Sequence, residues 1–91
     1  MKTSDFDNSL VNEVSEFLQK YMTNNRISSM TADECAEILA KNKILRNDVG
    51  PRQGFNFRQM LRDGRDGKIN QIEGVYQEKP RAKWNIRRVD R

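Results

Sequence analysis

Apolar residues recur at helical spacing along the first quarter of the chain. Steps of three or four residues dominate, and the stripe consists of Phe6, Leu10, Val11, Val14, Phe17, Leu18, Tyr21 and Met22. This period predicts an amphipathic helix over about residues 5–23 whose apolar face packs against a core. Ser4 with Asp7 is expected to cap its start, and residues 23–25 are expected to end it.

A second amphipathic segment begins at Thr31. Thr31 and Glu34 have the spacing of a capping box, in which each side chain bonds the backbone N–H of the other. The predicted helix runs to about residue 42, and its apolar face is formed by Ala32, Cys35, Ile38 and Leu39. The preceding residues, 26–30, suit either a short edge strand or a linker.

The third predicted helix has an arginine-rich outer face. It starts at Pro51, which suits a first helical position, or at Asn56 as an alternative cap. Its inward face is formed by Phe57, Met60 and Leu61, and its outward face by Gln59 and Arg62. Phe55 falls on the outward side, so either the helix starts after it or its ring contacts another group. Two glycines in residues 63–67 end the helix, because glycine adopts left-handed conformations freely.

The apolar period changes after residue 68. Residues 69–76 and 82–89 are predicted to form two antiparallel strands joined by 77–81, because Trp84 and Ile86 alternate with polar residues. Ile69 and Ile72 break strict alternation, which predicts a bulge near them or a strand that starts later. The predicted core joins all these elements through Leu10, Val14, Phe17, Ile38, Leu39, Leu61, Trp84 and Ile86.

The composition is that of one small polar domain over residues 1–91. The chain is 35% hydrophobic and 33% charged, which supports one compact core but no large enclosed active-site cavity. It has no histidine, and Cys35 is its only cysteine. An intramolecular disulfide, a Cys/His zinc site and every histidine-dependent catalytic triad are therefore excluded. Cys35 is interpreted as a small buried helix residue, and no catalytic site, metal or cofactor is expected.

No apolar run approaches the roughly 18 residues of a membrane-spanning segment, and residues 1–5 lack the apolar core of a signal peptide. A soluble cytoplasmic protein is expected.

Charge divides the chain in two: residues 1–45 hold five basic and seven acidic side chains, whereas residues 46–91 hold twelve basic and six acidic ones. Nine of those twelve cations are arginines, which suit phosphate and base contacts. The excess of arginine in residues 46–91 therefore favours the interpretation that this half binds a polyanion over the alternative that its charges are simply solvated.

The predicted elements follow the order helix, short strand, helix, helix and hairpin. The informative segments are the capped start at 31–34, the helix over 57–62 and the hairpin tip at 78–81. In this order the chain resembles the winged-helix domains, a helix-turn-helix variant with a C-terminal β-hairpin. The resemblance implies an α+β fold, mostly α, with the third helix in the major groove and the hairpin on the backbone or minor groove. Residues 43–53 are longer than the usual turn between the two helices, which puts the docking angle in doubt.

Candidate nucleic-acid contacts lie on the third helix and at the hairpin tip. They are Arg52, Arg58, Gln59, Arg62, Arg65, Lys79, Arg81 and Lys83. Gln59 and Arg62 are placed to reach base edges, because Gln pairs with adenine and Arg with guanine. The flanking and hairpin cations are assigned to phosphates or the minor groove. The alternative interpretation is a solvated helix face and a charged strand edge that discourages aggregation.

Two functional hypotheses follow. The first is a small double-stranded DNA-binding module, a transcriptional regulator or mobile-element accessory protein. The second is a winged-helix adaptor that binds protein or RNA, because a fold does not fix a function. A protein partner or a second copy of the chain would sit on the first and second helices. No small-molecule substrate and no membrane association is expected.

Overall fold

The computed structural model describes residues 6–46, 54–79 and 82–89. These residues form α1 (Asn8–Asn24), β1 (Ser29–Thr31), α2 (Ala32–Lys41), α3 (Phe55–Arg65), β2 (Val75–Tyr76) and β3 (Asn85–Arg87). The fold is mixed α+β, and about half of the described residues are helical. The strands form an antiparallel sheet in the order β1-β3-β2, so β1 is an edge strand, as one of the two alternatives for residues 26–30 predicts.

The first helix has the predicted apolar stripe but a different cap. Its N-cap is Asp7, whose carboxylate accepts a 2.8 Å hydrogen bond from the Leu10 N–H; Ser4 lies outside the described residues. The fully buried positions are Val11, Val14, Leu18 and Met22. Three members of the predicted stripe, Leu10, Phe17 and Tyr21, are half-buried at its flank. The opposite flank carries two buried polar residues, Ser15 and Gln19.

The predicted capping box at the start of α2 is confirmed. The Glu34 N–H donates to Thr31 Oγ1 at 3.2 Å, and the Thr31 N–H donates to Glu34 Oε1 at 3.0 Å. Two orphan N–H groups at the helix start are thereby satisfied. Cys35 and Leu39 on the inward face are completely buried, whereas Ile38 is half-buried.

The start of α3 lies between the two predicted positions. Gly54 is the N-cap and adopts a φ of +83°, a left-handed conformation that favours glycine. Asn56 is therefore inside the helix, and Pro51 lies outside the described residues. The predicted inward face is confirmed, because Phe57, Met60 and Leu61 are buried.

The end of α3 uses one of the two predicted glycines in a left-handed conformation. Gly67 has a φ of +80°, just after the helix ends. Gly64 instead lies inside the helix and is buried against the backbone of Asn70 and Gln71. Its missing side chain permits a close approach of the following loop.

The hairpin strands are shorter than the sequence predicts. Residues 69–73 do not pair as a strand, because two of their N–H groups bond to α1 instead: Asn70 donates to Asn8 Oδ1 at 2.8 Å and Glu73 to Ser15 Oγ at 3.1 Å. Gly74 contributes only its carbonyl, which accepts a hydrogen bond from the Arg87 N–H. Pairing begins at Val75, opposite Ile86. The alternative of a strand that starts later is therefore the right one.

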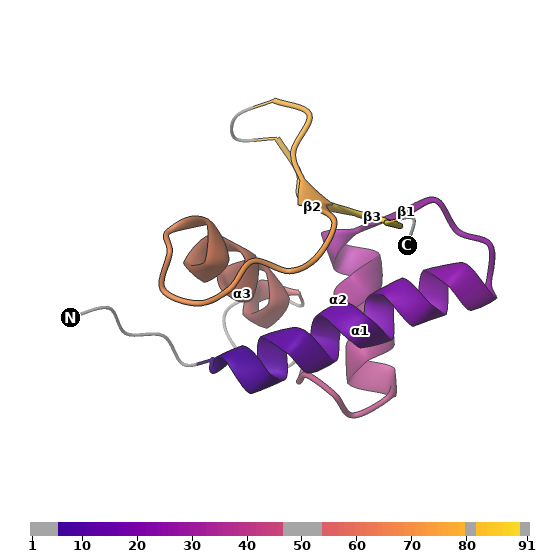
Figure 1. The fold of residues 1–91 in the computed structure, drawn as a ribbon, viewed down its shortest axis with the longest axis horizontal. Helices are drawn as coiled ribbons and strands as arrows, with labels where there is room; N and C mark the ends of the chain where they lie inside the picture. Colours follow the sequence, from indigo (N-terminus) through magenta and orange to yellow (C-terminus); the bar gives the residue numbers. More distant parts are fainter. Residues whose placement is uncertain (1–5, 47–53, 80–81, 90–91) are drawn as a thin grey trace.

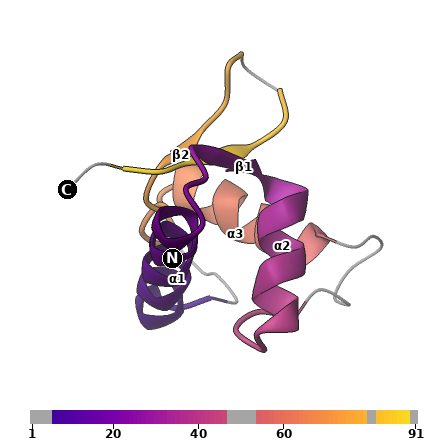
Figure 2. The same ribbon diagram turned by 90° about the vertical axis from the view of Figure 1, so that its right-hand side faces the viewer.

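The sheet lies at the start of α2, and the arms that lead out of β2 and β3 project away from the helices (Figures 1 and 2). The core lies between helices and sheet. Of its eight predicted members, Val14, Leu39, Leu61 and Ile86 are buried, and Leu10, Phe17, Ile38 and Trp84 pack half-buried against them. Within the described residues, every helix is too short or too polar to cross a bilayer.

Candidate nucleic-acid interface

Three polar side chains of α3 are joined in series. The guanidinium of Arg62 donates through Nη2 to Gln59 Oε1 at 2.9 Å, and Gln59 Nε2 donates to Asp63 Oδ1 at 2.8 Å. Asp63 is only 4% exposed, whereas Gln59 and Arg62 are half-buried. The two residues predicted to reach base edges are therefore in contact with each other, and Asp63 is the third member that the sequence did not indicate.

Phe55, the first residue of α3, lies next to Arg62. The guanidinium carbon of Arg62 is 5.4 Å from the centre of the Phe55 ring. This distance is within the range of a cation–π contact. Of the two predicted explanations for the outward position of Phe55, the second is therefore confirmed: its ring contacts another group, the Arg62 guanidinium.

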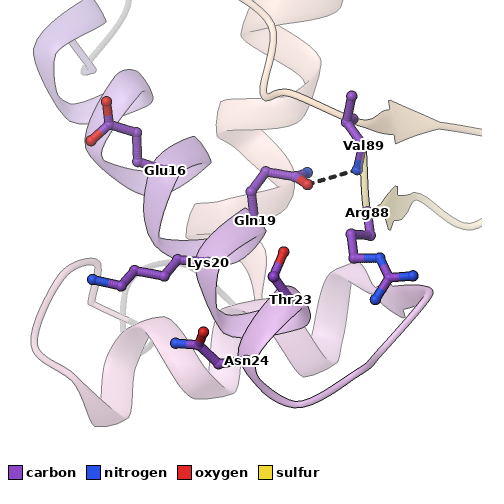
Figure 3. Close-up of a pocket in the computed structure, with 7 residues that line it drawn as sticks. All are labelled: Glu16, Gln19, Lys20, Thr23, Asn24, Arg88 and Val89. Carbon is purple, nitrogen blue, oxygen red and sulfur yellow. Dashed lines mark hydrogen bonds between the residues drawn. The ribbon is translucent and has the colours of Figure 1, made fainter. Parts of the chain in front are cut away.

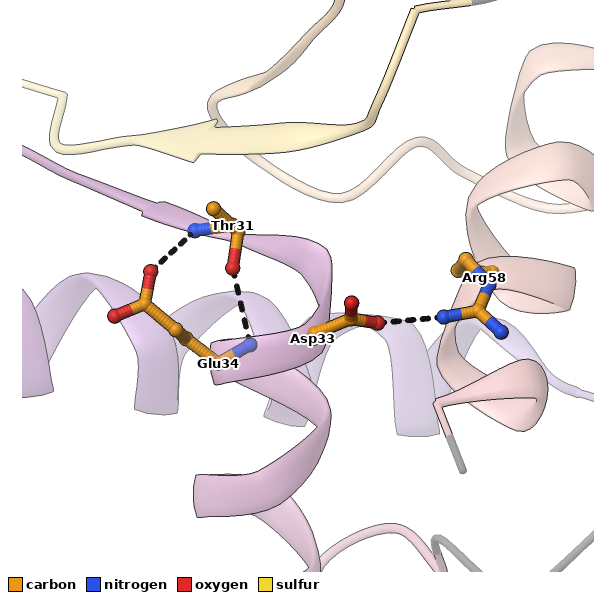
Figure 4. A network of polar contacts seen from close by, with 4 residues as sticks. All are labelled: Thr31, Asp33, Glu34 and Arg58. Carbon is orange, nitrogen blue, oxygen red and sulfur yellow. Dashed lines mark hydrogen bonds and ion pairs between the residues drawn. The ribbon is translucent and has the colours of Figure 1, made fainter. Parts of the chain in front are cut away.

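Arg58 is held by α2. Its Nη1 atom lies 2.5 Å from Asp33 Oδ1, and this ion pair joins the first turn of α2 to the first turn of α3 (Figure 4). A Cβ at Gly54 would come within 2.7 Å of Arg58 Nη1 and 2.9 Å of Asp33 Oδ1. Glycine at the N-cap therefore leaves room for the pair. Because Asp33 remains largely exposed, the pair is solvated and contributes about 1 kcal/mol or less to stability.

Arg65 connects the end of α3 to the sheet side. Its guanidinium carbon lies 5.8 Å from the centre of the Trp84 ring, and its Nε donates to Asp66 Oδ1 at 3.1 Å. The side chain is about half exposed. It thus presents a partly anchored cation between α3 and β3.

The hairpin arms carry exposed cations. Lys79 and Lys83 are both exposed, and the arms are held together by Gln77, whose Nε2 donates to the Ala82 carbonyl at 2.7 Å. The predicted contacts Arg52 and Arg81 lie outside the described residues. A further cation lies on the sheet itself: the guanidinium carbon of Arg87 is 4.7 Å from the centre of the Tyr76 ring.

Two residues that position the hairpin were missed from the sequence: Ser15 and Gln19, which we call the α1 clamp. Gln19 Nε2 donates to the carbonyls of Glu73 and Arg87 at 3.1 and 2.9 Å, and Gln19 Oε1 accepts from the Val89 N–H at 2.8 Å (Figure 3). Ser15 accepts from Glu73. In the sequence, the only sign of the clamp is that these two polar residues lie four positions apart along the border of the apolar stripe of α1.

A polar depression of about 510 Å³ lies beside the clamp, between the second half of α1 and the residues after β3. Its lining includes Glu16, Lys20 and Arg88 (Figure 3). It lies at the far end of α1 from α3 and holds none of the predicted contacts. Elsewhere in the described part of the chain, no group of three or more acidic or cysteine side chains is arranged to hold a metal ion.

Cys35 is interpreted correctly as a buried helix residue. Burial, with a smaller contribution from the neighbouring Glu34 charge, raises the pKa of its thiol to about 12. The thiol is therefore protonated at neutral pH and unsuited to nucleophilic or metal-binding chemistry.

Comparison with known proteins gives no relative: no family model, curated protein or solved structure matches the chain.

Proposed function

We propose that this chain is a duplex DNA-binding module with a winged-helix-like layout, in which α3 enters the major groove and the hairpin contacts the phosphate backbone or minor groove. The order of elements and the sheet order β1-β3-β2 support this layout. The contact between Arg65 and Trp84 links the end of α3 to the hairpin arm before β3.

The observation that carries the proposal is the placement of cations on α3 and the hairpin. Arg62 and Arg65 lie on one helix, with their guanidinium carbons 5.4 and 5.8 Å from the centre of an aromatic ring, and Lys79 and Lys83 are exposed on the hairpin arms that follow. Most of the exposed acids of the described residues lie instead on or beside α1 and α2, and only Asp66 and Glu78 lie on the α3 and hairpin side. A polyanion would therefore be attracted to the α3 and hairpin side.

Salt-dependent binding to duplex DNA tests the proposal. Fluorescence anisotropy with a labelled duplex should give an affinity whose logarithm falls linearly with the logarithm of the salt concentration, at roughly −0.9 per phosphate neutralised. A module of this size is expected to contact about four to seven phosphates. If no duplex binds at low salt, the proposal fails and an adaptor for RNA or protein becomes the better hypothesis.

A further inference from the structure

The orientation of the Gln59 side chain follows from its neighbours. A carboxylate only accepts hydrogen bonds and a guanidinium only donates them. The amide nitrogen of Gln59 must therefore face Asp63, and its amide oxygen must face Arg62, as the 2.8 and 2.9 Å distances require. Both bonds run to residues on the same helix, three and four positions further on, so both ends of the amide are engaged before any ligand arrives.

The Arg62 guanidinium contacts two other residues of α3. Its central carbon is 5.4 Å from the centre of the Phe55 ring, and Gln59 accepts a hydrogen bond from one terminal nitrogen. A guanidinium has five N–H groups, so the bond to Gln59 uses one of them and leaves a fork for a planar partner with two acceptors. Fixing the side chain in advance lowers the entropy that it loses on binding.

Resting on the DNA-binding function proposed above, we infer that Arg62 selects a guanine in the major groove and that Gln59 is a positioning residue which holds Arg62 rather than a second base contact. Guanine presents two acceptors, O6 and N7, that match the guanidinium fork. Adenine offers N7 beside an amino donor, and thymine offers a single acceptor beside a methyl group. The series Asp63, Gln59, Arg62 therefore specifies one base rather than the guanine and adenine pair that the sequence alone suggests.

The first experiment identifies the base. Duplexes retained from a randomised pool by the wild-type protein should share a guanine, and replacing it with 7-deazaguanine, which lacks the N7 acceptor, should weaken binding. The Arg62→Lys variant keeps the charge but loses the fork. Its preference for guanine over adenine at that position, measured by anisotropy, should fall by about 5- to 150-fold, the equivalent of the 1–3 kcal/mol that a bidentate contact contributes to discrimination.

The second experiment separates the roles of Gln59 and Arg62. Gln59→Met removes both hydrogen bonds at similar size, whereas Gln59→Glu keeps an acceptor for Arg62. The guanine preference should fall several-fold in Gln59→Met and recover in Gln59→Glu, even though the added negative charge weakens binding to every duplex. The ratio between the guanine and adenine duplexes is the readout, because it is independent of that general loss.

The outcomes distinguish this inference from the proposed function. Duplex binding without a preferred guanine, or an adenine preference that Gln59→Met abolishes while the guanine preference persists, overturns the inference and leaves DNA binding standing. If the wild-type protein binds no duplex at low salt, both the inference and the proposed DNA-binding function are overturned. The ratios are measured at a temperature below the unfolding midpoint of every variant, so that changes in them arise at the interface.

Discussion

Gly74 joins the hairpin to the rest of the fold. Its φ is +86°, its carbonyl accepts from the Arg87 N–H at 2.8 Å, and an added Cβ would collide with the Arg87 carbonyl oxygen. Gly67 has a similar φ of +80° but is exposed. The two positions therefore share a left-handed backbone, and only Gly74 is also enclosed by its partner strand.

The substitution Gly74→Ala is expected to lower the free energy of unfolding by about 3 kcal/mol or more, because the collision adds to the strain of a positive φ. Gly67→Ala is the matched control and should cost about 1–2 kcal/mol, the left-handed penalty alone. Urea denaturation measures both. Equal losses would show that strand β3 can move aside and that Gly74 is not a packing requirement.

Cys35 makes stability depend on pH in the alkaline range. Its thiol is completely buried, and its pKa rises from an ordinary value of 9.0 to about 12 in the folded protein. The unfolded chain therefore releases its thiol proton first as the pH rises above about 9. Folding stability is intact below that pH and declines between pH 9 and 12, by up to about 1.4 kcal/mol per pH unit.

Comparing the wild type with Cys35→Ala isolates this effect, because all other titrating groups are common to both proteins. Between pH 8 and 10 the wild type should lose about 1 kcal/mol more stability than the variant. Chemical denaturation at the two pH values measures the difference. Parallel profiles would mean that the thiol ionises equally in both states and is not desolvated.

Single side chains were predictable from the sequence where the interaction is local. The Thr31 and Glu34 capping box and the inward position of Leu61 depend on spacing along one helix, and both are confirmed. The bond between Gln59 and Asp63 also links nearby residues, but the turn formers around Asp63 favoured a turn interpretation. The burial of Asp63 depends on tertiary contacts that no local pattern encodes.

At the scale of elements, the α1 clamp determines where the hairpin begins. Ser15 and Gln19 bond backbone groups on both sides of the hairpin base, at Glu73, Arg87 and Val89. Because Glu73 is bonded to a helix, its N–H is not available to a strand. The predicted strand over residues 69–76 was too long for this reason, and contacts between residues 54 to 70 positions apart are invisible to periodicity.

Removing the clamp should destabilise the protein in proportion to the number of hydrogen bonds to the backbone that are lost. Gln19→Leu is similar in size but removes the hydrogen bonds to two carbonyls and one N–H, and it is expected to lower the free energy of unfolding by about 3 kcal/mol. Ser15→Ala removes only the hydrogen bond from the Glu73 N–H and should lower the free energy of unfolding by about 1–2 kcal/mol. Urea denaturation measures both. If Gln19→Leu cost no more than Ser15→Ala, water would be replacing the bonds and the clamp would not hold the hairpin.

At the scale of the whole molecule, the proposed function depends on which face meets the polyanion. The exposed Lys83 lies beside β3 on the hairpin arm, whereas the exposed Lys20 lies on the second half of α1 at the polar depression (Figure 3). Both are lysines in the same chain, so reversing either charge changes the net charge equally. Any difference between the two variants must therefore come from their positions.

Lys83→Glu is expected to weaken binding to a selected duplex and to a scrambled duplex alike and to reduce the magnitude of the salt slope by about one, because it removes a phosphate contact. Lys20→Glu should leave the affinity nearly unchanged at physiological ionic strength, where charges more than about 8 Å apart are largely screened. Both variants should unfold within about 0.5 kcal/mol of the wild type, since these side chains are exposed. Anisotropy titrations at several salt concentrations measure the affinities and slopes. Equal losses for Lys83→Glu and Lys20→Glu would indicate attraction by net charge alone and would contradict a defined binding face on α3 and the hairpin.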